Sequence, residues 1–257
     1  MGWLRDWKRK RLLEKHAIDA TLWRRVTAAL PFLAGLPAGK EQRLKEMAIV
    51  FLAEKSLSPL HGVQLGDADR LSIAIQACLP VLELGLQWYD GWVGVLVYPG
   101  EFRVKHEELD EDGVLHEWED ELVGESWEGG PVILSWQAVG EAGRVAEGGA
   151  NVVIHEFAHK LDMRNGQADG MPLLHAGMDP ALWRAVLEEA YMGFCDAVDR
   201  DKDTWLDPYA SEAPAEFFAV ASEAFFEAPG ELKRRYPDLY VQFTLFYRQD
   251  PALRLVP

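Results

Sequence analysis

Residues 155–159 read His-Glu-Phe-Ala-His, and this motif constrains the chain more than any other feature. Two histidines four residues apart lie on one face of an α-helix, about one turn from each other. Both imidazoles can then reach one Zn²⁺, while Glu156 stands beside them to take the proton of a metal-bound water. The flanking sequence favours a helix that begins after Asn151 as its N-cap. Its apolar positions are Ile154, Phe157, Ala158 and Leu161. The alternative is a buried helix with two hydrogen-bonded histidines.

A third metal ligand is needed, because a zinc hydrolase holds its metal through three protein side chains and leaves the fourth position for water. No histidine follows His159 at the short spacing of a metzincin, and residues 163–166 are Met-Arg-Asn-Gly instead. A carboxylate on a later element is therefore expected, and the helical segment 209–226 carries three candidates near one side. These are Glu212, Glu216 and Glu223. Periodicity alone does not choose among them, and the alternative for each is a solvated charge on a helix face.

Together with residues farther along the chain, this motif resembles the Mlc titration factor A family. These are bacterial zinc peptidases whose metal core is similar to the C-terminal domain of anthrax lethal factor. The resemblance rests on residues 155–162, on Tyr209 and on the Ala-Glu-Phe-Phe sequence at 215–218. It extends over nearly the whole chain through residues 73–88, 97–99, 129–136, 162–166 and 246–251.

The resemblance implies a role for each residue of the site. It singles out Glu216 as the third metal ligand beside the two histidines of the motif. It also implies that Tyr209, seven residues earlier, faces the substrate oxyanion. Glu212 and Glu223 are left with supporting or surface roles. The implied fold is α+β and zincin-like, with a small sheet packed on a mostly helical chain, and the implied cofactor is one Zn²⁺ per chain.

The chemistry of these residue types suits hydrolysis of a peptide bond. Two neutral imidazoles and one carboxylate leave a zinc site positively charged, which lowers the pKa of the bound water. Glu156 can accept the proton of that water and hand it to the leaving amine, and the Tyr209 hydroxyl can stabilise the oxyanion. Asp162, three residues after His159, is expected to accept a hydrogen bond from its ring nitrogen. The alternative for Asp162 is an ordinary carboxylate at a helix end.

The order of elements predicts one zincin-like unit over residues 1–257, with a mostly helical lobe at 1–90 and a sheet with the catalytic helices at 91–257. A chain with 49% hydrophobic residues and 10 Trp can bury a substantial core. Periodicity predicts helices over 18–34, 40–56, 67–84 and most of 140–248, and strands over 91–98 and 131–137. The Glu-rich helix is expected to have Ser211 as its cap and to end at Pro229.

Composition also limits location and partners. No apolar run is long enough to span a bilayer, and the first residues lack the apolar stretch and cleavage site of a secretory signal. The only cysteines are Cys78 and Cys195, which favours a reducing, cytoplasmic compartment. A net charge of −16 argues against a nucleic-acid partner held through its phosphates.

One basic and two acidic segments stand out from this background. Residues 3–15 mix Lys and Arg with Trp and Leu, and can form an amphipathic helix that touches a membrane or an acidic partner. The alternative is a solvated arm folded back on the acidic body. Residues 107–113 and 117–122 are acidic, with turn residues between short β-like pieces, and predict solvent-exposed hairpins.

Two classes of function follow from the sequence. The first is a zinc peptidase that hydrolyses short peptides, with aminopeptidase-like cleavage implied by the resemblance. The second is a regulatory binding protein, because the family takes its name from sequestering the glucose repressor Mlc, a role that need not use the metal. The two are compatible. Catalysis is favoured because all five active-site positions are intact: His155, Glu156, His159, Tyr209 and Glu216.

Overall fold

The computed structural model describes residues 11–13, 15–100, 102–109, 115–122, 124–126, 129–141 and 150–254. These residues form an α+β fold that is mostly helical, as predicted. The basic arm expected at residues 3–15 lies almost entirely outside the described residues. The division of the chain into lobes at residue 90 stays a prediction.

Helices α2 (Ala20–Ala28) and α3 (Ala38–Glu54) precede the first strand of the sheet, with the short helix η1 (Pro31–Leu33) between them, and α4 (Asp67–Cys78) follows that strand. The helix predicted over 18–34 is therefore wrong in its second half, because Pro31 has no N–H to continue the hydrogen-bond ladder. The helix predicted over 67–84 also ends early, at Cys78. Leu79 is still helical in conformation, but Pro80 follows it and has no N–H to continue the hydrogen-bond ladder.

A four-stranded sheet joins the helical segments, with the strand order β1-β2-β6-β5. Strands β1 (Ser56–Pro59), β2 (Gly94–Tyr98) and β6 (Val132–Ser135) are parallel, and β5 (Gly124–Ser126) runs antiparallel to β6 at one edge. Two sequence predictions are corrected here. Ser56, expected to be the last residue of the second helix, begins β1, and Trp136 begins helix α5 (Trp136–Glu141) instead of continuing the strand.

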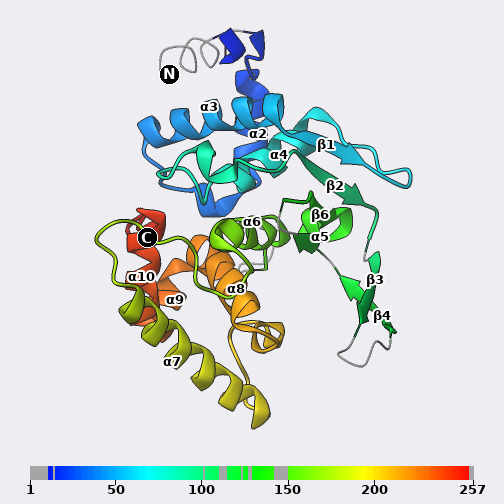
Figure 1. Cartoon of the computed structure of the whole chain (residues 1–257). Helices are drawn as coiled ribbons and strands as arrows, with labels where there is room; N and C mark the ends of the chain where they lie inside the picture. The colour runs from blue at the N-terminus through cyan, green and yellow to red at the C-terminus, as the bar shows by residue number, and fades with distance from the viewer. Residues whose placement is uncertain are drawn as a thin grey trace.

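The acidic residues 107–109 and 117–122 lie on the two strands of a single hairpin. Residues 110–113 lie outside the described residues, and the solvent exposure expected for these segments stays a prediction. Strand β3 (Phe102–Leu109) runs antiparallel to β4 (Leu115–Leu122), with a register that runs from Phe102↔Leu122 to Leu109↔Leu115. Figure 1 shows this two-stranded ribbon projecting away from the helices.

The C-terminal part is helical: α6 (Val152–Asp162), η3 (Met163–Asn165), α7 (Pro180–Asp199), η4 (Pro208–Ser211), α8 (Pro214–Glu227), α9 (Pro229–Arg235), α10 (Pro237–Tyr247) and η5 (Pro251–Leu253). Helix α8 begins at Pro214 as its first residue, a position that needs no N–H donor. The expected Ser211 cap is wrong: the Ser211 hydroxyl donates to Pro208 O at 2.8 Å, and the α8 N-cap is Ala213.

Helix α6 lies at the centre of the molecule and packs against both the sheet and α8 (Figure 1). Phe157 on this helix contacts the rings of Phe51, Tyr89 and Trp92. All eleven residues of α6 are buried, including five ionisable ones: His155, Glu156, His159, Lys160 and Asp162. Burying a charged group without partners is costly, so each of these five side chains needs compensating contacts. Their concentration on one buried helix is typical of a functional site.

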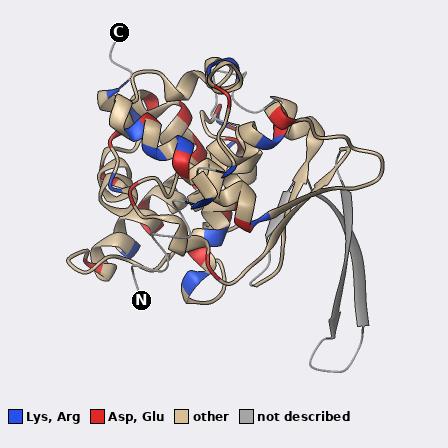
Figure 2. Cartoon of the chain, turned by 90° about the horizontal axis from the view of Figure 1, so that it is seen from above, with Lys and Arg blue, Asp and Glu red and all other residues tan. Residues whose placement is uncertain are grey.

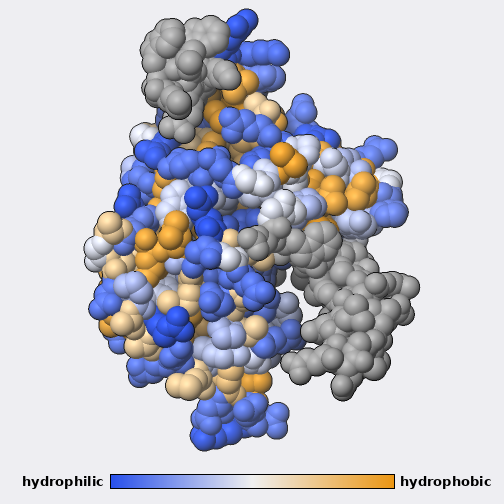
Figure 3. All heavy atoms as spheres, viewed as in Figure 1, coloured by the Kyte–Doolittle hydropathy of each residue, from blue (hydrophilic) through white to orange (hydrophobic). Residues whose placement is uncertain are grey.

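Acidic and basic residues are interspersed along the helices (Figure 2). On the face drawn in Figure 3, hydrophobic residues form small patches separated by hydrophilic ones. Among the described residues, no helix combines the length and apolar character needed to cross a membrane.

Candidate metal centre

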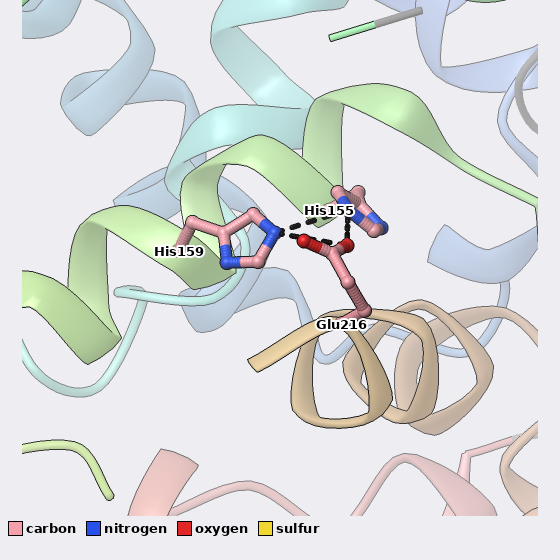
Figure 4. Close-up of side chains that lie close together, drawn as sticks. All are labelled: His155, His159 and Glu216. Carbon is pink, nitrogen blue, oxygen red and sulfur yellow. Dashed lines mark hydrogen bonds and ion pairs between the residues drawn. The ribbon is translucent and has the colours of Figure 1, made fainter. Parts of the chain in front are cut away.

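Three side chains from two helices converge at one point. His155 Nε2 lies 3.0 Å from Glu216 Oε2, His159 Nε2 lies 3.3 Å from the same oxygen, and the two Nε2 atoms are 3.1 Å apart. Figure 4 shows the two imidazoles of α6 and the carboxylate of α8 pointing toward one another. These are the three ligands expected from the sequence, and the fold brings them together.

Local sequence explains why the donors meet. His155 and His159 are four residues apart in α6, which is anchored by its predicted cap: Asn151 Oδ1 accepts a hydrogen bond from Ile154 N at 3.0 Å. Glu216 lies in the first turn of α8 and is half-buried, since the next residues of that helix enter the core. The packing of α6 on α8 then sets the distance between the histidines and the carboxylate.

The donor atoms fit a tetrahedral zinc ion. Zinc binds imidazole nitrogen and carboxylate oxygen at about 2.0–2.1 Å, and a tetrahedron of that size separates its ligand atoms by about 3.3 Å. The three observed separations of 3.0, 3.1 and 3.3 Å match these edges closely. Two nitrogens and one oxygen are also the ligand set of known catalytic zinc sites with an open fourth position.

The electrostatics of the centre favour a positive charge. Burial alone would lower the pKa of His155, but hydrogen bonds to Glu216 and Glu223 outweigh it and hold that pKa well above its usual value. Burial would raise the pKa of Glu216, yet hydrogen bonds from His155 and His159 keep it well below its usual range. Both shifts follow from the direct pairing of the imidazoles with buried carboxylates.

Glu156 and Tyr209, the two predicted catalytic residues, lie close to the three donors. Glu156 is only 2% exposed, and its charge raises the pKa values of both His155 and Tyr209. The Tyr209 ring lies 6.2 Å from that of His155, and the residue stays 38% exposed. Burial and then the charges of Glu216, Glu212 and Glu156 raise the Tyr209 pKa, so its hydroxyl stays protonated and able to donate.

The segment that carries Tyr209 is fixed by its neighbours. Asp207 Oδ1 accepts a hydrogen bond from Tyr209 N at 2.9 Å and so caps η4. The Tyr191 hydroxyl of α7 donates to Ser211 O at 2.9 Å. Tyr209 thus sits on a short helix held at both ends.

Two residues have surroundings that the sequence did not indicate. Asp162 Oδ2 accepts a hydrogen bond from Gly170 N at 2.7 Å, while Asp162 Oδ1 and His159 Nδ1 are buried without a hydrogen-bond partner among the described residues. The expected contact between Asp162 and His159 therefore stays a prediction.

Glu223, by contrast, is 5% exposed and its Oε1 lies 2.7 Å from His155 Nδ1. Its spacing of seven residues, two helical turns after Glu216, was the only sequence signal for this position.

Comparison with known proteins agrees with this centre. Residues 4–248 match the model of a family described as glucose-regulated metallo-peptidase M90. The chain is 44% identical over 230 residues to Mlc titration factor A of Cronobacter sakazakii, covering 88% of this chain and 86% of that protein. Proteins of the same name from Salmonella arizonae and an Enterobacter species are 43% and 41% identical, covering 88% and 93% of this chain and 90% of each relative. The chain belongs to the glucose-regulated metallopeptidase M90 family.

Proposed function

We propose that the protein is a zinc-dependent peptidase that hydrolyses peptide bonds of short peptides. His155, His159 and Glu216 would hold the metal, Glu156 would act as general base, and Tyr209 would donate to the oxyanion. The observation that carries the proposal is the convergence of the three donor atoms within 4.8 Å of one another on buried helices. Membership of a metallopeptidase family supports it.

Each residue has a chemical task in this proposal. Zinc, when bound, would supply Lewis-acid chemistry, acidifying a water molecule and polarising the scissile carbonyl. Glu156 follows His155 directly on α6, so its carboxylate can take a proton from the water and deliver it to the leaving amine. The protonated Tyr209 hydroxyl can stabilise negative charge on the carbonyl oxygen as the water attacks. His155, His159 and Glu216 fix where the reaction takes place.

Aminopeptidase-like cleavage and a cytoplasmic location are finer parts of the same proposal. The first rests on the family resemblance and the second on the two unpaired cysteines, of which Cys78 is fully buried. A panel of short peptides with free and acetylated N-termini tests the first part. Faster cleavage of the free peptides supports an aminopeptidase, and equal cleavage contradicts it.

Chelation tests the peptidase proposal as a whole. Peptide hydrolysis is measured before treatment with a chelator, after it, and after zinc is restored to the metal-free protein. The proposal expects activity to disappear and then to return with about one zinc per chain. Activity that survives complete removal of the metal would contradict it.

A second role is favoured by the names of the relatives, which are called Mlc titration factor A. We propose that the protein also binds a transcriptional repressor similar to Mlc, through a surface distinct from the metal centre. A folded regulator cannot easily reach buried His155 and His159, and the basic segment 3–15 is a candidate contact for an acidic partner.

Glu156→Gln should then bind the repressor as tightly as wild type, and deletion of residues 1–16 should weaken binding but preserve hydrolysis. Loss of binding on chelation, with the fold intact by circular dichroism, would place both functions at one site.

A further inference from the structure

A chain of buried polar groups runs from the metal centre into the core behind it. It starts at His155 Nδ1, on the ring edge away from the other donors, which lies 2.7 Å from Glu223 Oε1. The second Glu223 oxygen accepts a hydrogen bond from the backbone N–H of Asn151. His155, Glu223 and Asn151 are all buried, so no bulk solvent competes for these hydrogen bonds.

Asn151 is itself fixed by three further contacts. Its Oδ1 caps α6 by accepting from Ile154 N at 3.0 Å. Its Nδ2 donates to Gln76 Oε1 of α4 and to Glu227 Oε1 of α8, both at 2.7 Å. The residue that holds Glu223 is therefore tied to three helices, and Glu223 has little freedom to turn away from His155.

The direction of the hydrogen bonds determines the state of the imidazole. A carboxylate only accepts hydrogen bonds. With one Glu223 oxygen accepting from Asn151 N, the 2.7 Å contact of the other with His155 Nδ1 requires a proton on that nitrogen. A proton kept on Nδ1 leaves the Nε2 lone pair of His155 directed at the centre, where a metal needs it. His159 has no such support, because its Nδ1 is buried without a hydrogen-bond partner among the described residues.

We propose that Glu223, held by Asn151, is a positioning residue that fixes the tautomer and ring orientation of His155 for metal binding. The inference rests on the proposed zinc site. It makes the two histidines unequal, since Nδ1 of His155 faces a carboxylate, whereas Nδ1 of His159 has no hydrogen-bond partner among the described residues.

Glu223→Gln is the most informative substitution. The amide has one accepting oxygen where the carboxylate has two. If that oxygen stays on Asn151 N, the NH₂ group faces His155 Nδ1 and favours the tautomer with its proton on Nε2, which competes with the metal. Glu227→Gln is the matched control. Glu227 lies one turn farther along α8 and contacts Asn151, and the amide oxygen of its replacement can still accept from Asn151 Nδ2.

The experiment measures zinc dissociation constants by competition with a chromophoric chelator for wild type, Glu223→Gln, Glu227→Gln and Glu216→Gln. We expect Glu223→Gln to weaken zinc binding about 10–100-fold, the usual effect of removing an outer carboxylate partner, and Glu227→Gln to change it less than about twofold. Equal affinity of wild type and Glu223→Gln, while Glu216→Gln loses zinc, overturns the inference and leaves the proposed function intact. Failure of wild type to bind zinc removes both.

A spectroscopic measurement on the wild type tests the tautomer of His155 and does not require any variant to fold. In long-range ¹H–¹⁵N spectra of the zinc-loaded wild type, His155 should show a slowly exchanging, downfield proton on Nδ1. A proton there that exchanges as fast as that of a surface histidine contradicts the inference even if Glu223→Gln does not fold.

Discussion

His155 Nε2 and Glu216 Oε2 lie 3.0 Å apart although 61 residues separate them in the chain. The contact joins α6 to α8, and His159 on the next turn of α6 reaches the same carboxylate oxygen at 3.3 Å. Glu216 therefore supplies the third donor beside the two histidines of α6.

Glu156→Gln should leave zinc bound and lower peptide hydrolysis. Removing a positioned general base costs about 10²–10⁴-fold, whereas the three donor residues are unchanged. Zinc content and hydrolysis rate measured on the same preparation check this. A zinc-loaded variant with wild-type turnover would remove Glu156 from the mechanism.

Tyr209→Phe should cost about 10²–10³-fold in turnover, the range for loss of one oxyanion donor. The effect should fall on kcat more than on KM, because the hydroxyl would act on charge that develops only in the transition state. Steady-state kinetics at matched zinc content provide the measurement. Unchanged kcat would leave Tyr209 as a packing residue beside His155.

Gly170→Ala should disturb both stability and zinc binding. Gly170 has φ +77°, and an added Cβ would lie 2.7 Å from Leu187 Cδ2 and 2.9 Å from the carbonyl oxygen of Pro214, two residues before Glu216. Overpacking of this kind lowers the free energy of unfolding by about 1–3 kcal/mol. Gly177→Ala is the control, since φ is +98° there and nothing lies within 4 Å of the added atom. In denaturant unfolding and zinc titration, Gly170→Ala should be less stable and bind zinc more weakly than Gly177→Ala. Equal zinc affinity in the two variants would show that the packing of Gly170 against Pro214 does not set the position of α8.

Glu227→Gln should stabilise the protein at alkaline pH. Burial, with the nearby charge of Glu223, raises the Glu227 pKa from 4.5 to about 8, although a hydrogen bond from Asn151 lowers it. A carboxyl group with a raised pKa binds its proton more tightly in the folded state. Its contribution to stability is therefore full below about pH 4.5 and is lost as the pH rises toward 8. Unfolding midpoints at pH 5 and pH 9 should converge in the variant. A wild-type stability that does not fall over this interval would contradict the raised pKa.

The sequence predicted what depends on local spacing. His155, Glu156 and His159 were identifiable because four-residue spacing on a helix fixes their relation, and Asn151 because caps follow local rules. The choice of Glu216 over Glu212 and Glu223 came from the family resemblance, since periodicity left all three open. The structure brings Glu216 to the histidines, whereas Glu212 is exposed.

Contacts between segments far apart in the chain could not be predicted from local spacing. The hydrogen bond from Asn151 N to Glu223 joins residues 72 apart, and that from Asn151 to Gln76 spans 75 positions. Neither follows from a local pattern. Strand β1 was missed because four residues directly after a long helix give little period-2 signal, and its pairing partner β2 lies beyond the next helix.

Zinc content after substitution of one carboxylate tests the central claim most directly. Wild type, Glu216→Gln and Glu212→Gln are purified under the same conditions, and bound zinc is measured by mass spectrometry. The account predicts about one zinc per chain in wild type and Glu212→Gln, and strongly reduced zinc in Glu216→Gln. Zinc retained by Glu216→Gln and lost from Glu212→Gln would contradict it.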